Sequence, residues 1–326
     1  MNKVTLKDIA TQLNVSVATV SHVLNGIDDI SEETKKRVLT KAHDLGYITN
    51  NAAVSLRSGR TNTIAIIIPD ISNPHISYQV KQIECYMRKL NYSVIILNTN
   101  EDDTTEYQAI ITACSKQVDG ILLCPAQHST KNIEFLNQMN LPYILIGRYY
   151  SELDTDYVCA DDFKSGYLAA RYLLDQSCRN PIYIGVFNYI QSSKNRFDGI
   201  CHAFSEAGVP MSDERFIRTS PNSFNNKSLD RVLDSDFDSL IVFSDLLAFN
   251  VISKLKKENL YSRIPIISFD AIGNHIPLPF YNVSVGMIDD GWASVASAAL
   301  IDKINGSTKR YKTLIDVCLY IFNNFD

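Results

Sequence analysis

The sequence lacks any run of about 18 apolar residues, the length that a membrane-spanning helix needs. Even the apolar run that begins at Ile64 stops at Pro69. Lys3, Lys7 and Asp8 interrupt any apolar segment of a secretory signal. We therefore expect a cytoplasmic protein that has no membrane partner.

Paired cysteines and catalytic motifs are also missing. The seven cysteines never form a CxxC pair, so a reducing compartment and no metal site are expected. The sequence contains no GxxxxGK[ST], no GxGxxG after a strand and no GxSxG elbow. An α/β enzyme is the alternative from a different functional class, but it has no candidate catalytic residues and no cofactor motif.

Basic residues are not in excess overall, because the formal net charge is -5. The charge is unevenly spread. Residues 1–60 hold eight Lys and Arg against six Asp and Glu, and the remainder is correspondingly acidic. Only the N-terminal segment therefore has the net positive charge that favours binding to a polyanion. The length of 326 residues and the 45% hydrophobic content predict two or three folded units.

The N-terminal segment is predicted to form three short helices. The first has an apolar stripe at Leu6, Ile9, Ala10 and Leu13 and breaks at Asn14-Val15. Ser16 is expected to cap the second, which turns Val20, Val23 and Leu24 inward and ends at Asn25-Gly26. Four side chains remain on its outer face: Val17, Ala18, Ser21 and His22.

The third predicted helix begins at an N-cap, Ser31, and stops at Gly46. Its predicted buried stripe consists of Val38, Leu39, Ala42 and Leu45. A scaffold helix, a tight turn and a second helix with short outward side chains form the geometry of a major-groove reader. We expect the segment to bind DNA, although small three-helix clusters without that function pack in the same way.

Beyond Thr63, apolar runs alternate with amphipathic helical stretches, which predicts parallel sheets covered on both faces. The runs are more numerous than the strands of one compact sheet, so two lobes are expected. The runs are 64–68, 94–97, 120–124, 143–146, 157–159, 182–187, 240–243 and 265–269, with helical patterns at 80–90, 165–174, 196–207 and 246–258.

The segments 4–10, 14–26 and 31–47 closely resemble the headpiece of the LacI/GalR family of bacterial repressors. The resemblance implies base contacts by the outward side chains Val17, Ala18, Ser21 and His22. It implies a mainly phosphate-positioning role for Thr5, Ser16, Thr19, Asn25 and Tyr47. It also implies that Leu56 wedges into the minor groove from a hinge helix, unless Leu56 is an ordinary linker residue. Thr49 and Arg57 depart from the family pattern at this hinge.

The resemblance extends, more weakly, nearly to the C-terminus, through segments such as 66–75, 116–123 and 161–169. It implies a periplasmic-binding-protein-like α/β domain of two parallel-sheet lobes that holds an effector between them. The expected divisions are a helix-turn-helix headpiece at 1–48, a hinge at 49–62 and an effector domain at 63–326. Lobe 1 takes about 63–161 and 292–318, and lobe 2 about 162–291 and 319–326.

The implied effector contacts come from both lobes: His75, Arg148, Asp161, Ser192, Arg196, Ser244 and Asp270. An arginine and an aspartate at strand ends suit polyhydroxylated ligands, because each engages two hydroxyls in a defined geometry. The alternative is that Arg196 and Asp270 make ion pairs within the protein. Ser244 and Met287 depart from residues common in the family, and Ile190 argues against a purine corepressor.

The sequence therefore predicts a transcriptional repressor without enzymatic activity, a metal or a cofactor. Its expected partners are double-stranded operator DNA, a carbohydrate effector and a second copy of the chain, because one headpiece reads too few base pairs. A regulator that answers to a protein partner or to a non-sugar ligand is the alternative. The effector, its sense as inducer or corepressor, and the operator stay open.

Overall fold

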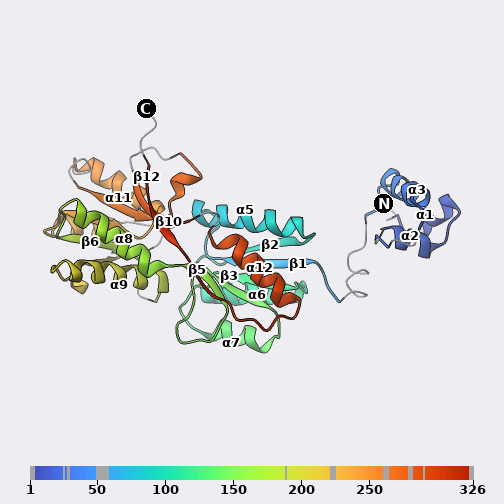
Figure 1. Cartoon of the computed structure of the whole chain (residues 1–326), viewed down its shortest axis with the longest axis horizontal. Helices are drawn as coiled ribbons and strands as arrows, with labels where there is room; N and C mark the ends of the chain where they lie inside the picture. Colours follow the sequence, from blue (N-terminus) through green and yellow to red (C-terminus); the bar gives the residue numbers. More distant parts are fainter. Residues whose placement is uncertain are drawn as a thin grey trace. The chain divides into compact units, whose positions relative to one another are not determined.

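The computed structural model describes residues 4–24, 26–27, 30–48, 59–187, 189–220, 225–259, 264–277, 282–288 and 291–322. The chain divides into two compact units, Met1–Thr61 and Asn62–Asp326 (Figure 1). Across the described residues, the helices are too short or too polar to cross a membrane.

The first unit consists of three helices, α1 (Leu6–Leu13), α2 (Val17–Leu24) and α3 (Glu32–Asp44). The sequence fixes where they begin and end. The Ser16 hydroxyl accepts the Thr19 N–H at 2.9 Å, Ser31 caps α3, and α1 ends at Asn14 with a φ of +53°. Ile9 of α1, Val20 of α2 and Val38 of α3 are fully buried against one another. The predicted caps and helix order are confirmed.

The prediction that Leu39 belongs to the buried stripe of α3 is wrong. Its side chain is 53% exposed. Val38, Ala42 and Leu45 are spaced i, i+4, i+7 and share one helix face, whereas Leu39 lies about 100° further around the helix. A hydrophobic residue next to a stripe does not necessarily belong to it.

The first lobe of the second unit is built on a six-stranded sheet in the order β11-β5-β4-β3-β1-β2. All its neighbouring strands are parallel. The strands are β1 (Thr63–Ile68), β2 (Ser93–Asn98), β3 (Gly120–Leu123), β4 (Tyr143–Ile146), β5 (Tyr157–Ala160) and β11 (Lys312–Ile315). α5 (Pro74–Lys89) and α12 (Trp292–Ile304) pack into the core on one face, and α6 (Asp103–Ser115) and α7 (Lys131–Gln138) into that on the other.

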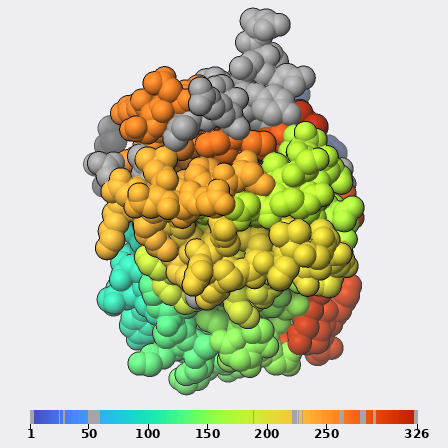
Figure 2. Space-filling view, turned by 90° about the vertical axis from the view of Figure 1, so that its left-hand side faces the viewer, coloured from blue at the N-terminus to red at the C-terminus, as the bar shows by residue number. Residues whose placement is uncertain are grey.

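The second lobe has its own six-stranded sheet, in the order β12-β10-β9-β8-β6-β7. Its strands are β6 (Pro181–Gly185), β7 (Phe216–Arg218), β8 (Ser239–Val242), β9 (Ile266–Phe269), β10 (Asn282–Met287) and β12 (Val317–Phe322). α8 (Asp162–Asp175) and α9 (Gln191–Glu206) cover one face, and α10 (Asn226–Leu233) and α11 (Asp245–Lys257) the other. Short 3₁₀ turns, η1 (Asp213–Arg215) and η3 (Ile272–Asn274), complete this lobe. Figure 2 shows the yellow and orange surface of this lobe above the green surface of the first.

The predicted architecture of two mostly parallel lobes is confirmed, with one exception. β12 runs antiparallel to β10. The chain passes between the lobes after β5, after β10 and at Asp316, between β11 and β12. Because the carboxyl ends of parallel strands form one edge of each sheet, these crossings leave two such edges facing a shared space.

Candidate functional site

The exposed face of α2 carries the side chains expected to read DNA. Val17 and Ala18 are exposed there, and Ser21 and His22 are half-buried beside them. Ser16 and Thr19 lie at the start of the helix and are joined by a hydroxyl–hydroxyl bond of 2.8 Å. Asn25 and Leu56, together with Thr49 and Arg57, lie outside the described residues.

The other two predicted DNA contacts lie off α2. The Thr5 N–H and hydroxyl both donate to the Asp8 carboxylate, at 2.8 and 2.7 Å. These bonds hold the pKa of Asp8 below its usual value. Tyr47, just after α3, packs half-buried against the headpiece core. Both side chains therefore make contacts within the headpiece, and Thr5 stays exposed to solvent while Tyr47 is half-buried.

In the second unit, a cavity of about 90 Å³ lies between the two lobes. One ordered water needs about 10–15 Å³ by this measure, so the cavity has room for a small polar molecule. Five of the seven predicted effector contacts line it: His75, Arg148, Ser192, Arg196 and Asp270. Residues that the sequence analysis did not select also line it, including Asn73, Asp162, Ser165, Phe243 and Trp292.

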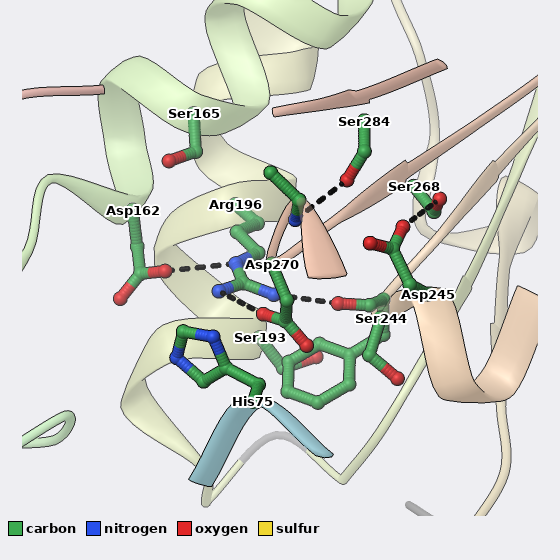
Figure 3. A network of polar contacts seen from close by, with 12 residues as sticks. His75, Asp162, Ser165, Ser193, Arg196, Ser244, Asp245, Ser268, Asp270 and Ser284 are labelled. Atoms are coloured by element: carbon green, nitrogen blue, oxygen red, sulfur yellow. Dashed lines mark hydrogen bonds and ion pairs between the residues drawn. The ribbon is translucent and has the colours of Figure 1, made fainter. Parts of the chain in front are cut away.

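Arg196 on α9 is held by contacts from several elements of the second lobe (Figure 3). Its Nε donates to Asp162 Oδ1 at 2.8 Å, and its Nη1 donates to the Phe243 carbonyl at 2.5 Å. Its Nη2 lies 3.6 Å from Asp270 Oδ1. The guanidinium also stacks over the ring of Phe269. Arg196 therefore does make an ion pair within the protein, as the alternative interpretation expected, and Asp162 is the nearer partner.

The charges around Arg196 do not balance, because two carboxylates share one guanidinium. Burial raises the pKa of Asp162 and outweighs the opposing effect of Arg196. Burial alone would lower the pKa of Arg196, but Asp162 and Asp270 together raise it. The guanidinium therefore stays charged, and Asp270, which it touches only at 3.6 Å, retains acceptor capacity toward the cavity.

The loop that carries Asp270 has an unusual backbone. Asp270 has a φ of +98° and Ala271 a φ of +48°, a conformation that residues with a Cβ rarely adopt. Three contacts impose it. Ser284 Oγ accepts the Ala271 N–H at 3.0 Å, and Asp245 accepts both the Ile272 N–H at 2.8 Å and the Ser268 hydroxyl. Strained backbone that is fixed by surrounding contacts is typical of functional sites.

Arg148 brings the second positive charge to the cavity wall, from the first lobe. It makes a two-bond ion pair with Glu101, 2.7 Å in each bond, and donates to the Pro125 carbonyl at 3.1 Å. Burial opposes its charge, but Glu101 raises the pKa of Arg148. Because the five guanidinium donors have fixed directions, these three bonds leave the Nε donor and one Nη2 donor without a partner among the described residues.

Two further polar groups at the cavity wall stand without a hydrogen-bond partner among the described residues. The Nδ1 atom of His75, in the first turn of α5, is buried and unpaired. Ser192, in the first turn of α9, is 94% buried, and its hydroxyl makes no hydrogen bond with the described residues. Such groups are costly unless a water or ligand satisfies them.

The remaining predicted effector contacts, Asp161 and Ser244, are not among the lining residues. Asp161 accepts the Lys164 N–H at 2.9 Å as the N-cap of α8, and Ser244 accepts the Leu247 N–H at 3.1 Å as that of α11. The N-cap bonds turn both side chains toward their own helices. In each case the next residue has a polar role: Asp162 binds Arg196, and Asp245 holds the Asp270 loop.

No cluster of three or more His, Cys, Asp or Glu side chains suited to a metal ion occurs in the part of the chain that the structure describes. The cysteine at the cavity wall, Cys124, is fully buried, and burial raises its pKa to about 12. Its thiol therefore stays protonated and unreactive near neutral pH.

Two family models together match most of the chain. Residues 5–50 match "Bacterial regulatory proteins, lacI family", and residues 61–304 match "Periplasmic binding proteins and sugar binding domain of LacI family". The chain belongs to the LacI family. Members of this family are DNA-binding transcriptional regulators with a periplasmic-binding-protein-like domain, not enzymes.

Relatives within the family align over most of their length. The HTH-type transcriptional regulator DegA of Bacillus subtilis is 31% identical over 82% of each chain. The ribose operon repressor of Haemophilus influenzae is 29% identical over 95% of each chain. Among solved structures, the lac repressor dimer bound to operator and an anti-inducer covers 98% of each chain with a TM-score of 0.84 at 17% identity.

Proposed function

We propose that this LacI-family regulator is a repressor whose affinity for operator DNA is set by a carbohydrate bound between the two lobes of its second unit. The observation that carries the proposal is Arg196, fixed between Asp162 and Asp270 at the wall of the cavity. A guanidinium beside carboxylates offers paired donors and acceptors to vicinal hydroxyls. We assign effector contact to His75, Arg148, Ser192, Arg196 and Asp270.

The charge of the cavity wall supports a polyhydroxylated ligand. Arg148 is matched by Glu101, and Arg196 is outnumbered by Asp162 and Asp270. The wall is therefore polar without an excess of positive charge, which suits hydroxyls. Two related structures, at 21% and 24% identity, are described as complexes with cellobiose and with ribose.

DNA binding is proposed for the face of α2, with Val17, Ala18, Ser21 and His22 directed at base edges. Short side chains there let a helix axis approach the groove floor. Thr5, Ser16, Thr19, Asn25 and Tyr47 are proposed to position phosphates, and Leu56 to enter the minor groove. A homodimer is proposed because palindromic half-sites need two headpieces, as in the operator-bound lac repressor dimer.

The effector part is tested by a thermal-shift screen of the full chain against D-ribose, D-xylulose, cellobiose and glucose 6-phosphate. A sugar that binds the folded state at 100 times its Kd stabilises it by about 2.7 kcal/mol. Operator binding is then followed by fluorescence anisotropy with and without that sugar. We expect one sugar both to raise the melting temperature and to change operator affinity.

The proposed DNA binding is tested by a separate experiment. Duplexes selected from a random pool should share a pseudo-palindromic sequence, and the affinity should fall steeply with salt as counterions are released. A regulator of this family that selects such a site but responds to no sugar or phosphosugar would support the alternative of control by a protein or a non-sugar ligand. Failure to select any site would overturn the repressor assignment itself.

A further inference from the structure

Helix α9, which carries Ser192 and Arg196 in its first two turns, begins without a cap of its own. Its N-cap residue is Ile190, which has no polar side chain and makes no capping bond. Most of the other long helices begin at a polar residue that accepts a first-turn N–H, as Asn73 does for α5 and Asp102 for α6. An N-terminus without such a partner leaves backbone donors unsatisfied.

The missing acceptor comes from the opposite lobe. Gln127 follows β3 in the first lobe, and its Oε1 accepts the N–H of Gln191, the first residue of α9, at 2.9 Å. Its Nε2 donates to the Tyr149 carbonyl, within its own lobe, at 2.8 Å. The side chain is 94% buried, and its backbone φ is +69°. Both ends of the amide are therefore fixed.

Other contacts between the lobes surround this bond. Asn195 on α9 donates to the Tyr149 hydroxyl at 3.4 Å. The ring of Tyr189, before α9, lies 4.2 Å from that of His128, which follows Gln127 in the first lobe. These contacts join the start of α9 to the loops after β3 and β4.

We propose that Gln127 is the N-cap of α9 supplied from the other lobe, so that the helix is capped only when the lobes are closed. A hydrogen bond of 2.9 Å is lost once the two atoms move apart by about 1 Å. Closure thus completes the first turn of the helix that presents Ser192 and Arg196. This makes Gln127 a positioning residue; only its link to effector response rests on the proposed function.

The coupling works in both directions. Capping stabilises a helix by about 1 kcal/mol, which corresponds to a factor of about five in the population of its ordered first turn. A ligand that bridges the lobes keeps Gln127 on α9, and the cap in turn favours the closed arrangement that the ligand needs. The bond therefore contributes to the free-energy difference between open and closed lobes.

Hydrogen–deuterium exchange of the full-length protein without ligand tests the cap directly. Gln127→Met keeps the side-chain length but removes the acceptor and the donor, so exchange in peptides covering residues 189–196 should rise about fivefold. Gln127→Glu keeps an acceptor for the Gln191 N–H at a helix N-terminus, where a carboxylate is favoured, but sets its other oxygen against the Tyr149 carbonyl. It should therefore raise this exchange less than Gln127→Met does. Peptides from β8 and α11 report any general destabilisation.

Tyr149→Phe is the matched control, because it removes the hydroxyl that Asn195 contacts and leaves the Gln127 bond intact. Exchange at 189–196 should then stay well below that of Gln127→Met. The proposal is overturned if Gln127→Met leaves this exchange unchanged. It is also overturned if Gln127→Glu, or Tyr149→Phe, raises it as much as Gln127→Met does. None of these outcomes depends on the identity of an effector.

Discussion

Gly166 of α8 and Gly199 of α9 face each other where the two helices cross. A Cβ on Gly166 would overlap the carbonyl oxygen of Arg196 and lie 2.7 Å from its carbonyl carbon. A Cβ on Gly199 would overlap the carbonyl oxygen of Phe163 and lie 2.9 Å from the Tyr167 nitrogen. Asp162 precedes Gly166 by one helical turn, and Arg196 precedes Gly199 by three residues, so this crossing sets the Asp162–Arg196 contact.

Gly199→Ala should therefore weaken both the fold and the cavity. The added methyl group meets backbone atoms, which cannot rotate away, so the helices must separate. Overpacking of this kind costs typically 1–3 kcal/mol. We expect a lower free energy of unfolding in urea and weaker binding of any sugar that stabilises the wild type.

Gly208→Ala is the control for the loss of a glycine as such. Gly208 has a φ of +74° and no atom within 4 Å of a Cβ position, so only the backbone conformation is strained. It should cost about 1–2 kcal/mol and leave sugar affinity unchanged. Equal sugar affinities for the two variants would show that the crossing does not position Arg196.

Asp162→Asn should change how stability depends on pH. The pKa of Asp162 is raised in the folded state, so between the unfolded and the folded pKa the folded protein keeps a proton that the unfolded chain releases. This contribution is present below the unfolded value of 3.8 and is lost as pH rises through the folded pKa. The asparagine does not titrate.

The stability of the wild type relative to Asp162→Asn should accordingly fall as pH rises above about 4 and through the raised pKa of the folded state. Urea unfolding at several pH values measures the difference. If the wild type gained stability over the variant in that range, the ion pair with Arg196 would outweigh burial, and the direction of the pKa shift would be wrong.

Much of the fold could be predicted because its central strands are continuous apolar runs, which parallel sheets covered on both faces require. The predicted runs omit β7, β10, β11 and β12, although β12 is itself apolar. β11 is an edge strand with alternating exposure, and β10 contains Ser284 and Gly286. The predicted run 182–187 overshot β6, which ends at Gly185. Apolarity identifies the centre of a sheet better than its edges.

The site was harder to predict, because neighbouring polar residues compete for the same role. In Asp161-Asp162, one residue caps α8 and the other, about 100° around the helix start, binds Arg196. Sequence alone gives no reason to choose between them. The trans cap by Gln127 has no local signal either, since it joins residues 64 positions apart.

Ala18→Leu should impair operator recognition without affecting the fold. Ala18 is exposed on α2, so a larger side chain meets no core atoms but holds the helix away from base edges. We expect specific affinity to fall by about 10- to 100-fold, while binding to random duplex at the same salt stays nearly constant. Leu39→Ala, at an exposed position of α3, is the control and should bind both duplexes like the wild type.

Asp245→Ala should release the strained Asp270 loop. The aspartate accepts the Ile272 N–H and the Ser268 hydroxyl, and an alanine removes the acceptor of both. Leaving a buried donor unsatisfied costs about 1–3 kcal/mol. Urea unfolding should show this loss, and sugar affinity should fall as well, although Asp245 does not line the cavity. Unchanged sugar affinity in a destabilised variant would mean that the loop conformation does not matter for binding.

Asp270→Asn should abolish most of the response to effector while leaving DNA binding intact. The substitution keeps size and shape but replaces one carboxylate oxygen by a donor. A ligand hydroxyl that donated to the carboxylate then loses a charge-assisted bond worth about 1.5–3 kcal/mol, or roughly 10- to 150-fold in affinity. Arg196 remains paired with Asp162 at 2.8 Å, so no buried charge is left alone, whereas Arg196→Ala would strand two carboxylates.

Asp175→Asn, at the exposed end of α8, is the control for loss of one negative charge. Thermal shift measures sugar binding, and anisotropy measures operator affinity without sugar. Wild-type sugar affinity in a normally folded Asp270→Asn protein would remove Asp270 from the effector site and leave Arg148 and His75 as the residues around which to rebuild it.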